Sequence, residues 1–396
     1  MTVEARSGPP ARYVMIGGFL GAGKTTAVAA LARRLEARGV RTGLITNDQS
    51  VGLVDTTLLR SKGFQVEEIA GGCFCCRFDS LTEAAERLTR DTRPEVFVAE
   101  PVGSCTDLVA TVSYPLRRIY GDRFTIAPLS VMVDPLRAAR ILGLREGRSF
   151  SDKVVYVYRK QLEEANLIVI NKCDRIDEPL RDRLVAVFEE EFPQATVLCC
   201  SAQQGDGLDR WFDLIDAREH PEDATMDIDY REYAAGEALL GWLNCTVRVH
   251  VGAEAGEPGE EAAGTVDGNR LLVRLAEQIG RRLASDGIEI AHLKMTLDSP
   301  DGGGNLSVVS LVGSDQEVDL RESLLDRVSG GSLIVNLRAE ADPERLERVT
   351  TEELAAAERP GLALELEHSE HFRPAEPVPT HRITLGGTEA VKAEAP

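Results

Sequence analysis

A run of glycines that ends in Lys-Thr is the clearest chemical signal in this sequence. The segment Gly18-Phe-Leu-Gly-Ala-Gly-Lys-Thr25 fits the pattern of Gly, four residues and Gly-Lys-Thr. Glycines let a loop turn its backbone N–H groups toward phosphate oxygens, and a following helix adds its positive end. The flanks agree, because 13–16 reads as a buried strand and 26–37 as a helix. We therefore expect a phosphate-binding loop made of Gly18, Gly21, Ala22, Gly23, Lys24, Thr25 and Thr26.

Two side chains of this loop and one later acid carry the expected catalysis. Lys24 would reach the β- and γ-phosphates of a nucleotide, and the Thr25 hydroxyl would bind Mg²⁺. Glu100 opens the segment Glu-Pro-Val-Gly and would hold Mg²⁺ through water, while the N–H of Gly103 would sense the γ-phosphate. Lys24, Thr25 and Glu100 are the expected catalytic residues, although an acid at a strand end can also be merely solvated.

The run Asn-Lys-Cys-Asp at 171–174 points to the base of the nucleotide. A carboxylate at Asp174 can accept hydrogen bonds from N1–H and the N2 amino group of guanine, and adenine lacks this pair of donors. The Ser-Ala pair at 201–202 would meet guanine O6 through a backbone N–H. A polar turn without a ligand is the alternative for this short string. The residues expected to bind guanine are Asn171, Lys172, Asp174, Ser201 and Ala202.

Three cysteines stand within four positions in the run Gly-Gly-Cys-Phe-Cys-Cys at 71–76. Two glycines permit a tight turn that can gather three thiol groups, and thiolates bind Zn²⁺, Cu⁺ and similar ions. One loop offers three ligands at most, and an open fourth position suits transfer of a metal better than structural locking. Buried or redox-active cysteines are the alternative. The expected metal ligands are Cys73, Cys75 and Cys76, whereas the isolated Cys105 and Cys245 are expected to be structural.

Acids at two further strand ends are weaker candidates. Asn47-Asp48 opens a loop that reaches Asp55, which is where a segment that responds to the γ-phosphate is expected. Asp48 could bind Mg²⁺ or the thiolate-held metal, and a solvated loop acid is an equal alternative. Asp134 is expected to cap a helix.

Short apolar runs alternate with helical stretches from residue 11 to about 218. This alternation predicts an α/β fold, with a doubly wound and mostly parallel sheet of the P-loop NTPase kind between helices on both faces. Because ligands bind at the carboxyl ends of such strands, the motifs can converge on one edge. The expected strands are 13–16, 42–46, 65–69, 95–99, 129–133, 166–170 and 196–200, and the expected helices include 80–90 and 180–192.

A second pattern follows a polar and acidic stretch. Its order, β-α-β-β-β-α, predicts a smaller C-terminal α+β domain with ferredoxin-like character. Its expected strands are 243–251, 288–297, 305–312 and 333–339, and its expected helices are 269–284 and 343–357. The expected divisions are a disordered start (1–10), the P-loop domain (11–218), a linker (219–238), the second domain (239–359) and a disordered acidic, Pro-rich tail (360–396).

Composition limits the partners and the compartment. The chain has 396 residues and a net charge of −20 at pH 7, so nucleic acid is not an expected partner. No apolar run approaches a membrane span, and the first residues lack the apolar core of a secretory signal. Eight cysteines without a regular framework indicate reduced thiols, and hence the cytoplasm.

Together these segments resemble the CobW-type family of P-loop metallochaperone GTPases, which is related to the nickel-insertion GTPases of urease and hydrogenase maturation. The matching segments are GGFLGAGKTT (17–26), GGCFCC (71–76), EPVG (100–103) and NKCD (171–174). The resemblance covers about residues 12–215. It implies slow GTP hydrolysis, metal binding at the three cysteines and delivery of metal to client proteins. The chain departs from the family after Asn47, where Asp replaces the usual Glu and a second Glu is missing.

The sequence thus favours a GTP-binding and GTP-hydrolysing metal chaperone that uses Mg²⁺ and carries Zn²⁺ or Co²⁺. Its partner would be a metal-requiring client protein, and a homodimer stays open. One alternative is a GTP-dependent regulator or assembly factor for a cofactor enzyme, with a structural zinc site. Another is a small-molecule kinase with the same phosphate loop, for which the run at 171–174 would be incidental.

Overall fold

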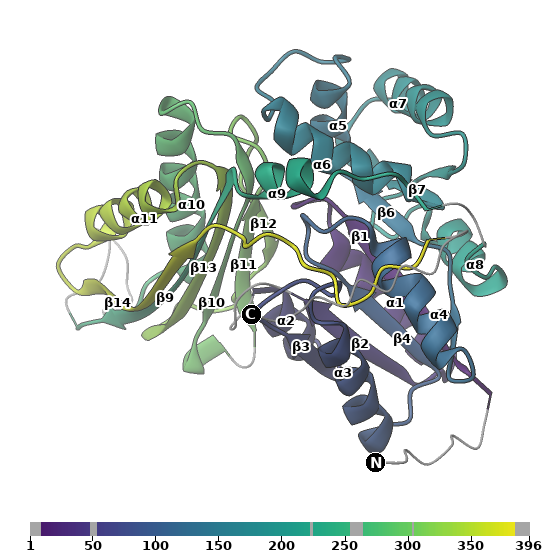
Figure 1. The fold of residues 1–396 in the computed structure, drawn as a ribbon. Helices are drawn as coiled ribbons and strands as arrows, with labels where there is room; N and C mark the ends of the chain where they lie inside the picture. Colours follow the sequence, from purple (N-terminus) through teal and green to yellow (C-terminus); the bar gives the residue numbers. More distant parts are fainter. Residues whose placement is uncertain (1–8, 48–53, 222–224, 254–263, 303–304, 385–396) are drawn as a thin grey trace, which may run out of the picture.

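The computed structural model describes residues 9–47, 54–221, 225–253, 264–302 and 305–384. Asp48 and residues 1–8 lie outside the described residues, so the expectations for them stay predictions. The described chain forms two units, each built around its own sheet (Figure 1).

The first sheet has eight strands, in the order β3-β2-β4-β1-β6-β7-β8 with the short β5 also paired to β1. The strand pairs described in it are parallel. Side chains of the central strand alternate between two cores, since Tyr13 and Met15 join one core and Val14 and Ile16 the other. The predicted doubly wound α/β sheet is confirmed. Its strands are β1 (Ala11–Gly18), β2 (Thr42–Asn47), β3 (Val66–Ile69), β4 (Val96–Glu100), β5 (Phe124–Ile126), β6 (Ser130–Val133), β7 (Leu167–Ile170) and β8 (Thr196–Cys199).

Helices cover both faces of this sheet. In α1 (Lys24–Ala37), Val28, Leu31 and Leu35 recur at helical spacing and pack on one face together with α8 (Leu208–Ala217). The opposite core takes apolar residues from five other helices. These are α3 (Phe78–Asp91), α4 (Tyr114–Tyr120), α5 (Pro135–Ile141), α6 (Asp152–Glu163) and α7 (Glu178–Glu191), with a π-helix at Val109–Ser113 before α4 and a 3₁₀ turn at Cys173–Arg175 after β7.

The second sheet is antiparallel and has six strands in the order β12-β11-β10-β13-β9-β14. The apolar residues of one sheet face share a core with two helices, α10 (Gly268–Ser285) and α11 (Pro343–Ala357). The predicted smaller α+β domain is confirmed, with two strands more than its expected order. Its strands are β9 (Leu240–Val251), β10 (Ile290–Asp298), β11 (Leu306–Leu311), β12 (Asp319–Glu322), β13 (Gly330–Glu340) and β14 (Leu362–Phe372).

The prediction of a disordered tail from residue 360 is wrong for Leu362–Phe372. This segment is β14, which pairs along the length of β9. Leu362 and Leu364 pack in the core, and Glu365 and Glu367 pair with basic side chains of β9. The acidic composition of this segment therefore made its strand pattern hard to recognise. The expected linker also contains a helix, α9 (Tyr230–Glu237), whose Asp229 side chain caps its first turn.

Helix α2 (Val54–Ser61) lies between the two units. Val54 and Leu58 share a small apolar cluster with Leu306 and Val308 of β11. The Val54 N–H donates to Asn336 Oδ1 of β13 at 3.1 Å. The segment after β2 is therefore packed against the second sheet.

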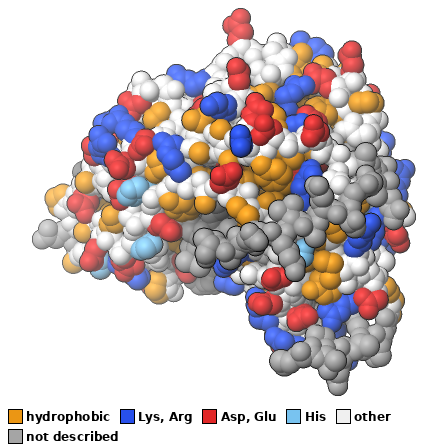
Figure 2. Space-filling model, in the orientation of Figure 1, with side chains coloured by type: hydrophobic (Ala, Val, Ile, Leu, Met, Phe, Trp, Pro, Cys, Tyr) orange, Lys and Arg blue, Asp and Glu red, His pale blue; other side chains and the backbone are white. Residues whose placement is uncertain are grey.

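Charged side chains of both signs are interspersed over the face that Figure 2 shows, so the net negative charge is not gathered there into one acidic surface. Among the described residues, none of the helices combines the length and apolar character that crossing a membrane requires.

Candidate functional site

The phosphate loop has the backbone geometry that its glycines predict. Gly18 and Gly23 both adopt positive φ, at 123° and 96°. A Cβ atom on Gly18 would lie 2.3 Å from the Met132 carbonyl oxygen, and one on Gly23 would lie 2.3 Å from Asn171 Nδ2. Lys24 is buried and donates to the Gly18 carbonyl at 2.8 Å, and burial lowers the pKa of its ammonium group. The loop therefore holds the Lys24 ammonium group close to where the phosphates of a nucleotide would lie.

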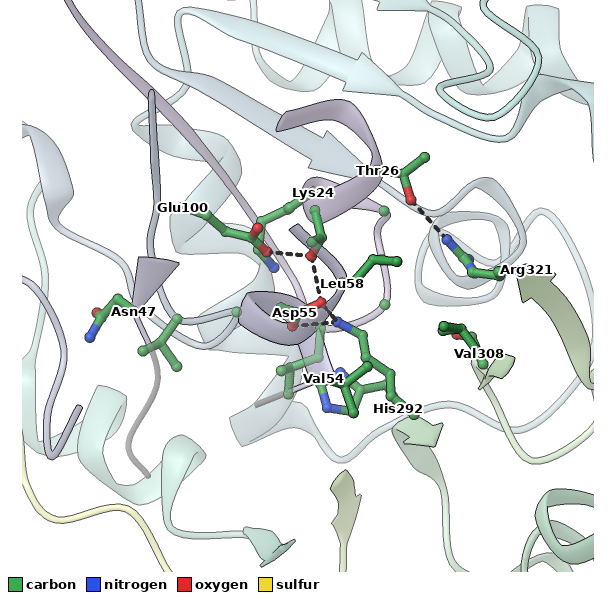
Figure 3. Close-up of a pocket in the computed structure, with 18 of the residues that line it drawn as sticks. Lys24, Thr26, Asn47, Val54, Asp55, Leu58, Glu100, His292, Val308 and Arg321 are labelled. Carbon is green, nitrogen blue, oxygen red and sulfur yellow. Dashed lines mark hydrogen bonds and ion pairs between the residues drawn. The ribbon is translucent and has the colours of Figure 1, made fainter. Parts of the chain in front are cut away.

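Three oxygen-bearing side chains meet beside this loop. The Thr25 hydroxyl lies 2.6 Å from Asp55 Oδ1 and 3.0 Å from Glu100 Oε1 (Figure 3). Glu100 Oε2 is buried without a hydrogen-bond partner among the described residues. Hydroxyl and carboxylate oxygens are the ligands that Mg²⁺ prefers, and an unpartnered buried carboxylate oxygen fits a missing cation. Thr25 and Glu100 are thus together as predicted, and Asp55 joins them.

Charge in this group is shared unevenly. Burial, and then the nearby Asp55 carboxylate, raise the pKa of Glu100 to about 7. Although burial acts in the same direction on Asp55, the Lys294 ammonium at 2.6 and 2.7 Å holds the pKa of Asp55 below its ordinary value. At neutral pH Asp55 is therefore negatively charged, whereas Glu100 is partly protonated and a bound cation would ionise it.

The run at 171–174, which was expected to bind the base, lies beside the phosphate loop. Asn171 donates to the Ala22 carbonyl at 2.8 Å, and Lys172 donates to the Gly21 carbonyl at 2.8 Å and to Asp134 at 2.8 Å. These bonds fasten the run to the phosphate loop. Asp134 caps α5 as predicted, through the Arg137 N–H. Asp174 is exposed and lines a second cavity, with its carboxylate available to a ligand.

Ser201 and Ala202 line the same second cavity, but their N–H groups already have partners. Ala202 donates to Asn171 Oδ1 at 2.9 Å, and Ser201 donates to the Asp206 carbonyl at 2.9 Å. Their contact with guanine O6 stays a prediction.

The expected nucleotide residues thus divide between two adjoining cavities. The phosphate cavity is lined by Gly21, Gly23, Lys24, Thr25, Thr26, Glu100 and Gly103, and the base cavity by Thr26, Asn171, Lys172, Asp174, Ser201 and Ala202. Gly18 and Ala22 contribute carbonyl oxygens to the loop that joins them.

The second sheet supplies residues that sequence reasoning missed. Lys294 and His292 of β10 and Trp242 of β9 line the phosphate cavity, and Arg321 of β12 lines both cavities. Asp55 was named only as the end of a loop, although it lies at the center of the site. The one signal that the sequence held for β10 was its polar alternation at 292, 294 and 296, which equally describes a strand facing water.

The thiol loop gathers its three sulfur atoms. Sγ of Cys73 lies 2.6 Å from that of Cys75 and 3.2 Å from that of Cys76, and the Cys75–Cys76 distance is 3.7 Å. Gly71 and Gly72 adopt positive φ and make the turn that permits this. The three side chains together can hold a metal ion, as their order in the sequence predicted. Cys105, expected to be structural, is buried beside this cluster and helps to lower the pKa of Cys73.

The thiols of this loop differ in their pKa values. Hydrogen bonds from Cys105, Cys75 and Cys76 lower the pKa of Cys73 well below its ordinary value. The bond to Cys73 raises the pKa of Cys76 to about 12. Cys73 is therefore the thiol of this cluster that ionises most readily, and a soft or borderline cation could replace the protons of the thiols.

One side chain connects the thiol loop with the nucleotide cavity. Asn47, at the end of β2, lines the phosphate cavity and donates to the carbonyls of Ile69 at 3.0 Å and Gly72 at 2.7 Å. Gly72 directly precedes Cys73 in the loop.

The C-terminal segment covers the other side of the thiol loop. The Thr380 N–H donates to the Cys75 carbonyl at 2.9 Å, and the Val378 N–H points to Cys76 Sγ at 3.2 Å. This segment follows β14 and crosses the first domain, as the yellow trace in Figure 1 shows.

Comparison with known proteins finds similarity to nucleotide-binding proteins in the first domain. Residues 12–198 match the model of the CobW/HypB/UreG nucleotide-binding domain. The zinc chaperone CobW of Sinorhizobium sp is 30% identical over 185 residues, which cover 41% of this chain and 51% of that protein. The zinc chaperone YeiR of Escherichia coli (strain K12) is 30% identical over 168 residues, 41% of this chain and 47% of that protein. The chain thus spans about half the length of the curated relatives it matches.

A crystal structure of the Zn(II)-bound YjiA GTPase from E. coli is also similar. The match covers 89% of this chain and 100% of that chain, with 15% sequence identity and a TM-score of 0.38.

Proposed function

Since residues 12–198 match the model of the CobW/HypB/UreG nucleotide-binding domain, we propose that this chain is a GTP-hydrolysing metal chaperone. It would bind a transition metal at the thiol loop and deliver it to a metal-requiring client protein. Two of the relatives are named as zinc chaperones, which supports Zn²⁺ as the metal, and a three-thiolate site also admits Co²⁺.

For nucleotide binding, each residue has a role that its position supports. The phosphate loop and Lys24 would hold the β- and γ-phosphates, and Asp174 would select guanine. Thr25, Glu100 and Asp55 would bind Mg²⁺, which supplies charge that offsets the negative charge developing on the phosphates. Gly103 lies against the phosphate loop, where a Cβ atom would be 3.0 Å from the Leu20 nitrogen. Its N–H could therefore respond to the presence of the γ-phosphate.

For metal binding, Cys73, Cys75 and Cys76 would be the ligands on the protein. Three sulfurs leave a fourth position of a tetrahedral ion for another group, and a client's ligand could enter there. The client and any homodimer are part of this proposal and depend on the family resemblance.

The observation that carries the proposal is the position of Asn47. Its side chain belongs to the phosphate cavity, yet its amide holds the carbonyl that directly precedes the first cysteine. A nucleotide that moved the end of β2 would therefore move the thiol loop, and the two sites would be coupled.

The test is a Zn²⁺ titration of the full chain with and without a non-hydrolysable GTP analogue and Mg²⁺. We expect zinc affinity to differ by about fivefold or more between the two conditions, the lower end of ordinary coupling. Asn47→Ala should reduce this difference while leaving zinc binding itself in place. Equal affinities in both conditions would contradict the coupling and leave a static zinc site.

Two controls complete the experiment. A variant with Cys73, Cys75 and Cys76 replaced by Ser should lose the bound zinc, whereas Cys245→Ala, which removes a buried thiol far along the chain, should keep it. Competition between GTP and ATP for the empty protein separates the chaperone from a small-molecule kinase, because Asp174 favours guanine only.

A further inference from the structure

Arg321 stands where the two cavities of the nucleotide site meet. It belongs to β12 of the second sheet, and its Nη1 donates to Thr26 Oγ1 at 3.0 Å (Figure 3). Thr26 and Arg321 are the two described residues that line both the phosphate cavity and the base cavity. The second domain therefore contacts the part of the site that lies between the expected positions of the base and the phosphates.

The guanidinium group of Arg321 is mostly buried and has a donor that makes no hydrogen bond within the described part of the chain. Its side chain is only 17% exposed, and Nε has no hydrogen-bond partner among the described residues. Asp319 is the nearest carboxylate, 3.4 Å from that Nε, and Asp319 also pairs with Arg175 at 3.1 Å. Two guanidinium groups thus share one carboxylate, and a buried cation with an unused donor indicates a missing anion.

The geometry of a bound nucleotide identifies this anion. With its β- and γ-phosphates at Lys24 and its base at Asp174, GTP would place its ribose and α-phosphate at the junction beside Thr26. Guanidinium groups bind phosphate oxygens through two parallel N–H bonds, which a lone ammonium group cannot do. We propose that Arg321 binds the α-phosphate of the nucleotide, so that the second domain completes the site within one chain.

This inference rests on the proposed function, because it requires that the chain bind guanine nucleotides. It also assigns the C-terminal sheet a role, since a nucleotide would join the two domains through its α-phosphate. Binding of either GDP or GTP would then affect β12 as well as the thiol loop.

The test is calorimetric binding of GDP and a GTP analogue to the full chain and to Arg321→Ala. Charge-assisted hydrogen bonds contribute enough that we expect a loss of roughly tenfold or more in affinity for both nucleotides. Arg321→Lys should recover part of it, because the charge remains and the fork is lost. GMP, which keeps the α-phosphate, should also bind more weakly to the alanine variant, and guanosine should bind equally to both proteins.

Lys62→Ala is the matched control. Lys62 pairs with Glu322, the residue next to Arg321, so this variant weakens the contact between the domains outside both cavities. It should change nucleotide affinity by less than about twofold, as surface pairs contribute little. Urea unfolding without nucleotide shows whether each variant is folded, and Arg321→Gln replaces the alanine variant if that one is not.

The outcomes separate the two proposals. If the wild-type chain binds no guanine nucleotide, the proposed function fails and this inference fails with it. If the wild-type chain binds GDP and the folded Arg321 variants bind it equally well, or no worse than Lys62→Ala, only this inference is overturned.

Discussion

Glu164 places a carboxyl group inside the first domain, behind the segment that follows Glu100. Its two oxygens accept hydrogen bonds from the Thr106 hydroxyl at 3.1 Å and the Val109 N–H at 3.0 Å. Burial, and then the nearby Asp107 carboxylate, raise the pKa of Glu164 to about 8. The side chain therefore holds this loop mainly as a neutral acid at pH 7.

This protonation state predicts how stability depends on pH. The unfolded carboxyl group ionises near its ordinary pKa of 4.5, while the folded one keeps its proton until about pH 8. The contribution of Glu164 is therefore complete below pH 4.5 and is lost as pH rises toward 8, by up to about 1.4 kcal/mol per pH unit. Urea unfolding at pH 5, 6, 7 and 8 should show a shallower decline for Glu164→Gln than for the wild type. Parallel curves for the two proteins would contradict this assignment.

At the scale of single residues, the sequence revealed those that lie in short runs. Lys24, Thr25 and the three cysteines belong to local patterns whose backbone needs are visible in their glycines. Asp55 and Arg321 belong to no such pattern. They are single charges on ordinary elements, and only the packing of the second sheet on α2 and α1 makes them part of a site.

The C-terminal segment is the element whose role differs most from its composition. It was predicted to be a disordered tail, yet Val378, Thr380, Arg382 and Ile383 contact the first domain. The Ile383 N–H donates to the Ala110 carbonyl at 2.8 Å, and Arg382 pairs with Asp107 at 2.8 Å. Asp107 is 1% exposed and adopts a positive φ of 62°, so this loop depends on its partners.

Removing the charge of Arg382 should therefore lower the free energy of unfolding. Arg382→Ala leaves Asp107 buried with Tyr230 as its remaining side-chain partner, and breaking a buried pair typically costs roughly 3 kcal/mol or more. Arg373→Ala is the matched control from the same segment, because Arg373 and its partner Asp342 are both exposed and should contribute less than about 1 kcal/mol. Urea denaturation midpoints of the two variants measure the difference. Equal losses would mean that the segment is not fastened through Asp107.

Elements were predictable where they followed the common patterns of burial. Seven of the eight parallel strands were predicted from short apolar runs, whereas the short β5 was missed, and α10 was found from its helical period. In β10, by contrast, the alternating polar residues would equally fit a face turned to water, whereas His292 and Thr296 are buried. Alternation alone cannot tell a solvated face from one that packs on a polar partner.

At the scale of the whole molecule, the two domains meet through charge as well as through apolar contact. Lys294 of β10 binds both oxygens of Asp55, and Lys62 pairs with Glu322 at the other end of α2. The Lys294 pair is about four-fifths buried, and the Glu322 carboxylate is 44% exposed. The first of these pairs should therefore carry more of the energy that holds the domains together.

Replacing Lys294 should expose this difference. Lys294→Met leaves the Asp55 carboxylate beside Glu100 without its ammonium partner, and we expect a loss of roughly 2 kcal/mol at pH 7. Because Lys294 lowers the pKa of Asp55, the stabilisation is complete above the ordinary pKa of that acid and is lost as pH falls through the lowered pKa of the folded state. Unfolding at pH 7 and at pH 3 should thus show a large and then a small effect, and Lys62→Met should lose less at pH 7. A Lys294→Met effect that is the same at both pH values would contradict the assignment to Asp55.

The position of the C-terminal segment also affects the protein during its synthesis. The N–H that points to Cys76 Sγ belongs to Val378, which a ribosome adds 302 residues later. The three cysteines leave the ribosome together with their turn, and they meet water, metal ions and oxidants long before this segment exists. Every nascent chain therefore passes through a stage in which the three thiols of this loop are complete and uncovered.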